Sequence, residues 1–183
     1  MIASAFLLRT MASVAPGTRV VDVACGDGAH VHALASLGFD VWASAEAPED
    51  VDATRARLSE VIGPDEAVRR VSRARPDALG YPDAFAPWVV AAEPDGATLA
   101  ETFAEARRVL APGGWLWTDL TGAGPDADAL DIEARLAADT AAVTALAAAA
   151  RATGLAVASR PIPDAARGTV VAVFRRVDAD TVR

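Results

Sequence analysis

The sequence RVVDVACGDG, residues 19–28, decides the fold. Its first part, 19–24, is the continuous apolar run typical of a strand buried on both faces of a parallel sheet. A sharp turn follows, in which Gly26 and Gly28 let the backbone approach a ligand closely before a helix begins. Open α/β sheets bind ligands at the carboxyl ends of their strands, beside the first strand. The turn is therefore the expected binding loop, and Asp22 is expected to place a carboxylate near the amines of the turn and of a cationic ligand.

Strand-like apolar runs alternate with amphipathic helical stretches along the chain, an order typical of βαβ units. Strands are expected at 19–24, 40–45, 68–73, 88–92, 115–120, 155–160 and 169–177, and helices at 6–14, 29–37, 48–61, 98–110 and 126–152. The short connection between the last two strands predicts an antiparallel hairpin. The expected fold is a doubly wound α/β domain spanning 1–183. It has a mostly parallel seven-stranded sheet, helices on both faces and a C-terminal antiparallel hairpin.

The charge balance argues against nucleic acid as a partner. The chain has 25 acidic and 17 basic residues, and a net charge of -8 repels a phosphate backbone unless arginines cluster. The densest arginine group, within 69–75, has no interleaved aromatic residue. The lone cysteine, Cys25, can form neither an internal disulfide nor a zinc cage, which indicates a reducing cytoplasm and no metal. The apolar run 2–8 is too short to span a membrane, so no membrane association is expected.

The turn after the first expected strand resembles the first motif of class I S-adenosylmethionine-dependent methyltransferases. In that motif an acidic residue is followed by small residues at alternate positions, and Ala24 stands here for the opening glycine. The longer stretch 17–50 is most similar to small tellurite-resistance-type and related small-molecule methyltransferases. The resemblance implies that the cofactor is S-adenosylmethionine and that the partner is a small-molecule methyl acceptor. It also implies that the cofactor is bound by Asp22, Ala24, Cys25, Gly26, Asp27 and Gly28.

Two later segments resemble other parts of the same family. The segment 111–114, APGG, is similar to a family motif that ends a helix and enters the fifth strand, so its implied role is structural. The segment 77–85 resembles the connection that borders the adenine. By that resemblance Asp77 accepts a hydrogen bond from the exocyclic amine and Ala78 offers its backbone amide. The alternative for Asp77 is a solvated loop carboxylate.

The chain departs from the family at the end of the second expected strand. The family places there an acidic residue that binds both ribose hydroxyls, and spacing assigns that position to Ala45. Glu46, one residue on, reaches the ribose if the strand end bulges, and it is otherwise a solvent-facing carboxylate. Loss of the ribose contact costs on the order of 2–3 kcal/mol. Glu93, after the fourth expected strand, is assigned to the cofactor border or to a base, with an ordinary loop carboxylate as the alternative.

No catalytic residue stands out, which suits in-line methyl transfer, because orientation alone can supply much of the rate enhancement. The alternative to an active methyltransferase is a catalytically degenerate member of the same fold that binds cofactor weakly or binds a partner. A nicotinamide-dependent oxidoreductase is disfavoured, because His30 and Val31 stand where the dinucleotide-binding turn requires its third glycine. His30 either borders the methionine end of the cofactor or has a structural role.

Overall fold

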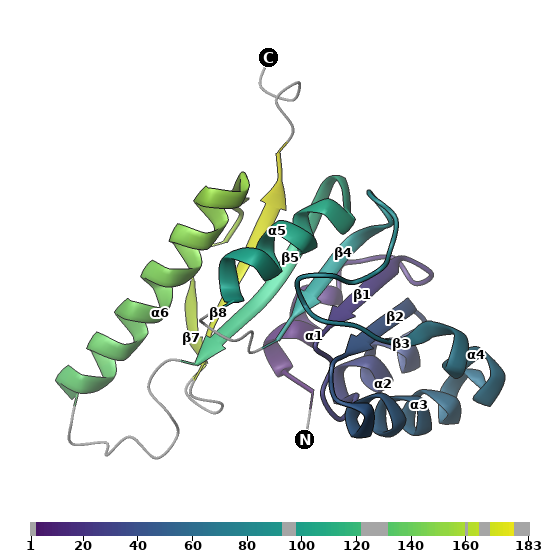
Figure 1. The fold of residues 1–183 in the computed structure, drawn as a ribbon. Coiled ribbons are helices and arrows are strands. Elements are labelled where there is room, and N and C mark those ends of the chain that lie inside the picture. The colour runs from purple at the N-terminus through teal and green to yellow at the C-terminus, as the bar shows by residue number, and fades with distance from the viewer. Residues whose placement is uncertain (1–2, 93–97, 122–131, 160, 165–168, 178–183) are drawn as a thin grey trace.

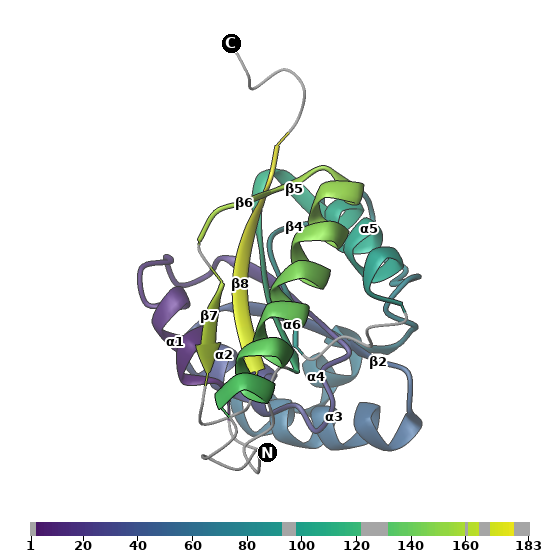
Figure 2. The same ribbon diagram turned by 90° about the vertical axis from the view of Figure 1, so that its left-hand side faces the viewer.

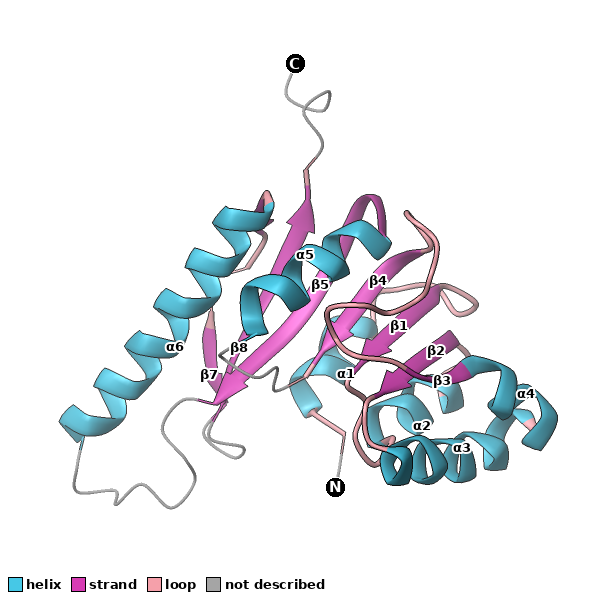
Figure 3. Cartoon of the chain, in the orientation of Figure 1, coloured by secondary structure: helices cyan, strands magenta, loops and turns pink. Residues whose placement is uncertain are grey.

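In the computed structural model, a mixed sheet forms the centre of the molecule and helices lie on both of its faces (Figures 1 and 3). The structure describes residues 3–92, 98–121, 132–159, 161–164 and 169–177. The strands are β1 (Arg19–Val23), β2 (Asp40–Ala45), β3 (Val71–Arg73), β4 (Ala86–Ala91), β5 (Leu110–Thr121), β6 (Leu155–Val157), β7 (Ile162–Asp164) and β8 (Thr169–Arg176). Their order across the sheet is β3-β2-β1-β4-β5-β8-β6, and β7 pairs with β8 beside this path. The first five strands are parallel, whereas β8 runs antiparallel to β5, β6 and β7.

The helices divide between the two faces of the sheet. They are α1 (Ala5–Met11), α2 (Ala29–Ser36), α3 (Pro48–Ile62), α4 (Pro64–Arg70), α5 (Leu99–Val109) and α6 (Ile132–Thr153). Figure 2 shows α1 on one side of β8 and α5 and α6 on the other. Buried residues of α1 to α4 pack with the sheet into one apolar cluster, and those of α5 and α6 pack into a second. Each face of the sheet therefore has its own core.

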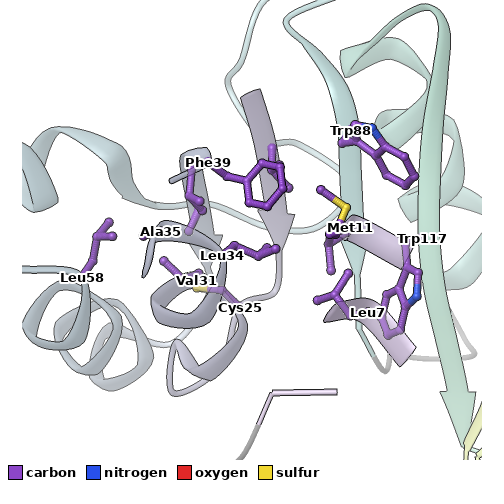
Figure 4. Packing of buried hydrophobic residues seen from close by; sticks show 14 of the residues in the cluster. Leu7, Met11, Cys25, Val31, Leu34, Ala35, Phe39, Leu58, Trp88 and Trp117 are labelled. Atoms are coloured by element: carbon purple, nitrogen blue, oxygen red, sulfur yellow. The ribbon is translucent and has the colours of Figure 1, made fainter. Parts of the chain in front are cut away.

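The core on the α1 face of the sheet packs α1 and α2 against the strands. Figure 4 shows Leu7 and Met11 of α1 between α2 and the tryptophans of β4 and β5. Leu7, Leu34 and Trp117 are each 0% exposed, and burial of such side chains contributes about 1.5–3 kcal/mol apiece. This packing holds α2 at a defined position behind β1.

The registers of β1, β2 and β4 bring their carboxyl ends to one edge of the sheet. Val23, the last residue of β1, lies opposite Ser44 of β2 and Ala91 of β4. The backbone amide of Cys25 donates to the carbonyl oxygen of Ser44 at 2.9 Å, so the turn after β1 continues alongside β2. Ligands of open α/β sheets bind at this kind of edge.

The fold class predicted from the sequence is confirmed, with local corrections. Residues 68–70 were expected in a strand but form the last turn of α4, and only 71–73 pair with β2. Pro64 opens this helix, and Glu66 pairs with Arg69 and Arg70 one turn later, so capping and ion pairs favour the helix here. A further short strand, β7, adds to the expected seven. The strand expected from 115 begins at 110, so the segment 111–114 lies within β5.

Across the described segments, no helix has both the length and the apolar character that a membrane span requires. The same residues include no group of three or more His, Cys, Asp or Glu side chains placed to hold a metal ion.

Candidate functional site

The turn after β1 contains two glycines that are needed for different physical reasons. Gly26 has a φ of +52°, and a Cβ built on it would meet no heavy atom within 4 Å. Its missing side chain therefore leaves open space at the edge where a ligand is expected. Gly28 has a φ of +78°, and a Cβ there would lie 2.8 Å from the Cα and Oγ1 atoms of Thr54 in α3. The sequence suggested that both glycines make room for a ligand, but Gly28 makes room for α3.

Ala24 is an exposed residue with a φ of 56°, in the left-handed region that costs an L-residue with a Cβ about 1–2 kcal/mol. The turn thus retains the backbone shape of a glycine at this position without having one. The strain is in the backbone of the turn, at Ala24.

The strain at Ala24 predicts that Ala24→Gly raises the free energy of unfolding by about 0.5–1 kcal/mol, because relief of the clash outweighs the extra entropy of glycine in the unfolded chain. Urea unfolding monitored by circular dichroism measures this change. Ala12→Gly is the matched control, since Ala12 is exposed but has a φ of -61° and should lose stability on substitution. Equal destabilisation by the two changes would show that Ala24 is not strained.

Asp22 is fully buried in β1, between Ala43 of β2 and Val90 of β4. Neither of its carboxylate oxygens has a hydrogen-bond partner within the described part of the chain. Burial, with a smaller contribution from the carboxylate of Asp119, raises the pKa of Asp22 to about 8. The sequence placed this carboxylate near the turn amines, and in the structure it makes no hydrogen bond to them. A buried, unsatisfied carboxylate beneath the turn is costly, and a cationic group placed near it offsets that cost.

The side chains of the turn itself anchor it to α2 and α3. Asp27 accepts a hydrogen bond from the Ala29 amide at 3.1 Å and forms an ion pair with Arg57 at 2.9 Å. Cys25 is buried against Thr54, with 3.3 Å between Sγ and Oγ1, and burial raises the pKa of the Cys25 thiol to about 12. A thiol that stays protonated is a poor nucleophile. Thr54 also donates to the carbonyl oxygen of Gly26 at 2.9 Å, so α3 determines the shape of the turn.

A hollow of about 290 Å³ at the carboxyl end of β2 brings together two carboxylates that are far apart in the sequence. It is lined by Glu46, Arg75, Pro76, Asp77 and Thr98. Glu46 is exposed and directly follows β2, and its carbonyl oxygen accepts a hydrogen bond from Arg73 at 2.9 Å. Glu46 and Asp77 had been assigned to the ribose and the adenine, and the two now line one space.

The loop that carries Asp77 differs in detail from the expectation. Asp77 receives a hydrogen bond from Arg75 at 2.9 Å, and this bond holds the pKa of Asp77 below its usual value. The Ala78 amide donates to the carbonyl oxygen of Arg75 at 3.0 Å, so it is already used within the loop. The Ala78 amide can reach an adenine only if this short turn opens.

Ala45 is 1% exposed and belongs to the core on the α1 face. An aspartate at this position would restore the acidic residue that the family resemblance implies there. In the folded chain, however, its carboxylate would replace a buried methyl group, and burial of an unpaired charge is costly. Ala45→Asp is therefore expected to destabilise the protein.

The structure assigns a role to one of the two remaining candidate residues, His30 and Glu93. His30 is 6% exposed, its Nε2 accepts a hydrogen bond from the Ser4 amide at 3.1 Å, and its ring contacts Trp117 edge-on. This is the structural role for His30, which ties α1 to the first turn of α2. Glu93 lies outside the described residues.

Sequence reasoning missed Asp119, which is fully buried near the end of β5 and raises the pKa of Asp22. A carboxylate inside the apolar run 115–120 was the available signal. It also missed Thr54, because contact between α3 and the turn is a tertiary feature with no local pattern.

An open, mostly parallel sheet with a glycine turn after its first strand defines a class of proteins that bind nucleotide-like ligands at that edge. The model of one family within this class, described as a methyltransferase domain, matches residues 21–118. This chain belongs to that family.

Solved structures show the same fold at low sequence identity. The geranyl diphosphate C-methyltransferase of Streptomyces coelicolor A3(2), in complex with Mg²⁺, geranyl diphosphate and S-adenosyl-L-homocysteine, is similar with a TM-score of 0.70 and 15% identity over 94% of this chain and 77% of that chain. A SAM-dependent methyltransferase from Methanosarcina mazei has a TM-score of 0.66 and 13% identity over 97% and 99%. A SAM-dependent methyltransferase from Aquifex aeolicus has a TM-score of 0.68 and 16% identity over 94% and 88%. No curated protein matches the sequence. The comparisons support an enzyme of the methyltransferase class and S-adenosylmethionine as its cofactor.

Proposed function

We propose that this chain binds S-adenosylmethionine across the carboxyl ends of β1 and β2 and transfers its methyl group to a small-molecule acceptor. The observation that carries the proposal is the left-handed Gly26, whose missing side chain leaves open space in the turn that follows the unsatisfied buried carboxylate of Asp22 in the chain. The hollow lined by Glu46 and Asp77 lies at the carboxyl end of β2, the strand that pairs with β1. A cradle for a nucleoside with positive charge at its other end fits these residues.

The residues of the site divide the work of binding. The turn around Gly26 gives the methionine portion close access to the backbone, and Asp22 in β1 supplies a compensating negative charge when a cationic ligand lowers its raised pKa and displaces its proton. Glu46 accepts hydrogen bonds from the ribose, and Asp77, held by Arg75, borders the adenine. Bound S-adenosylmethionine supplies a methyl group on a positively charged sulfur. The chain then has to exclude water and align an acceptor atom with that methyl group, which orientation alone can make effective.

A small-molecule acceptor agrees with the geranyl diphosphate bound by a structural neighbour. The likeness of residues 17–50 to tellurite-resistance-type enzymes, a single domain over 1–183 and a cytoplasmic location are parts of the same proposal. The lone buried Cys25 favours the location.

The ribose assignment predicts that Glu46→Ala lowers the affinity for S-adenosylhomocysteine about ten- to hundredfold, because a pair of charge-assisted hydrogen bonds is lost. Calorimetric titration measures the change. Glu49→Ala is the matched control, since Glu49 is also exposed and lies three residues further on in α3. If both variants bind like the wild type, Glu46 is a solvated carboxylate that makes no hydrogen bonds to the ribose hydroxyls.

The degenerate-binder alternative is favoured by one observation, the buried alanine at position 45. Titration of the wild type with S-adenosylmethionine, S-adenosylhomocysteine and NAD separates the candidates. An active methyltransferase binds the first two at a single site with micromolar affinity or better and does not bind NAD. Affinities weaker than about 1 mM for all three would favour the degenerate protein.

A further inference from the structure

A second concave region lies on the α1 face of the sheet, away from the glycine turn. It is a groove of about 350 Å³, within the roughly 300–1,000 Å³ typical of small-molecule sites. Trp88, Trp115 and Val171 form its floor on β4, β5 and β8, Phe6 of α1 forms one wall, and Ile162 of β7 contributes to the other. Figure 2 shows α1 and β7 on this side of the sheet, opposite α5 and α6.

The groove is built to hold something flat and uncharged. Trp88 and Trp115 stack on each other with their ring centroids 5.7 Å apart and their planes 13° from parallel, so the floor is aromatic and apolar. Ile162 is 46% exposed, and exposed apolar side chains that border a concave aromatic floor mark binding sites. None of the described residues that line the groove is charged. Two guanidinium groups lie over these rings, Arg175 at 5.3 Å from the Trp115 centroid and Arg9 at 5.7 Å from the Phe6 centroid, and both are already engaged in these cation–π contacts.

Two hydroxyl groups give the groove directional contacts. The Thr10 hydroxyl donates to the Phe6 carbonyl oxygen at 2.8 Å, so its oxygen keeps lone pairs for a further hydrogen bond. Ser159 Oγ accepts from the Val173 amide at 3.2 Å, so its proton can be donated to a ligand. Apolar pockets with a few placed polar groups are typical of small-molecule sites.

One end of the groove lies at the level of the proposed cofactor site. Ala91, the last residue of β4, pairs with Thr118 of β5. The next residue of β5, Asp119, pairs with Val171 of β8, which lies in the floor of the groove. Trp88 lies three residues before Ala91, so the groove extends about 10 Å along the strands, up to their carboxyl ends.

The wall that α1 forms also has one end close to the helix that follows the glycine turn. The Ser4 amide that bonds to His30 lies two residues before Phe6, and His30 lies two residues after Gly28. The Phe6 end of the groove is thus tied to the helix that follows the glycine turn, and the Ser13 end points away from it.

We propose that this groove binds the uncharged, flat apolar body of the methyl acceptor and presents its reactive end at the carboxyl edge of β4 and β5. The inference rests on the proposed function. It assigns the acceptor class as an uncharged aromatic or polyene-like small molecule with at least one hydrogen-bonding group.

The test uses 2-naphthol at pH 7 as the probe and follows quenching of tryptophan fluorescence, because Trp88 and Trp115 form the floor. Ala158→Phe fills the groove from an exposed lining position, and Ala148→Phe is the matched control at an exposed position of α6 on the opposite face. The wild type and Ala148→Phe should bind 2-naphthol saturably and alike. Ala158→Phe should weaken binding at least about tenfold, because the inserted ring occupies the space of the probe. Both variants should retain wild-type affinity for S-adenosylhomocysteine.

The outcomes separate this inference from the proposed function. If S-adenosylhomocysteine binds but 2-naphthol does not, or binds Ala158→Phe equally well, the groove is not the acceptor site. If S-adenosylhomocysteine displaces 2-naphthol, the probe occupies the cofactor site and the inference is wrong. If sedimentation shows a wild-type dimer that Ala158→Phe dissociates, a second copy of the chain covers the groove, and the inference is again wrong. If 2-naphthol binds the groove but S-adenosylhomocysteine binds nowhere, both the proposed function and the acceptor role of the groove are wrong.

Discussion

Replacing Gly26 with Val is expected to lower the affinity for S-adenosylhomocysteine about a hundredfold or more. A Cβ at this position points into open space that the ligand is proposed to fill, and a β-branched side chain does not tolerate a φ of +52°. Steric exclusion and distortion of the turn therefore act together. Calorimetric titration of the folded variant measures the loss.

Gly17→Val is the control for backbone strain. Gly17 has a φ of +80° and equally open surroundings, but it precedes β1, at the opposite end of the strand from the proposed site. Both variants should lose comparable stability, and only Gly26→Val should lose affinity. Wild-type binding by a folded Gly26→Val protein would remove the turn from the site.

Replacing Asp22 with Asn is expected to change how stability depends on pH. The pKa of Asp22 is about 8 in the folded protein, against an ordinary value of 3.8 for the unfolded chain. Between these values the unfolded chain releases the proton while the folded protein keeps it, so this residue makes the free energy of unfolding fall as pH rises from about 4 to about 8. Each unit of raised pKa corresponds to about 1.4 kcal/mol. The cofactor-free Asn variant should therefore equal the wild type near pH 4 and exceed it by a few kcal/mol at pH 8.

The same substitution should weaken the binding of S-adenosylmethionine about tenfold, since Asn offers no negative charge to a cationic ligand. Urea unfolding across pH 4–9, together with ligand titration at pH 8, measures both effects. Asp52→Asn is the control, because Asp52 is an exposed carboxylate on α3. If Asp22→Asn and the wild type have parallel pH profiles, Asp22 is already compensated in the folded protein.

The fold could be predicted from the sequence because its signals are local. The apolar runs and the turn at 24–28 predicted the order of strands and helices along the chain, and the structure confirmed the fold class. The sequence analysis misplaced 68–70 because Val68 and Val71 suggested a strand, whereas Pro64 and the ion pairs made by Glu66 favour a helix. Capping and ion pairing outweighed the apolar pattern.

The candidate site was less accessible to sequence reasoning, because its parts come from different elements. Spacing identified Gly26 as a turn residue, but only the packing of α3 shows that Gly28 makes room for Thr54. Likewise the spacing of β2 identified position 45 without revealing that its side chain is buried in the core. Burial and contacts between distant segments have no local pattern to read.

The most direct test of cofactor binding at this edge is a crystal structure with S-adenosylhomocysteine bound. The account predicts electron density for the methionine portion against the turn at Gly26, the ribose within hydrogen-bond distance of Glu46, and the adenine beside Asp77. A ligand bound elsewhere on the molecule, or one at the turn with both Glu46 and Asp77 directed into solvent, would contradict the account.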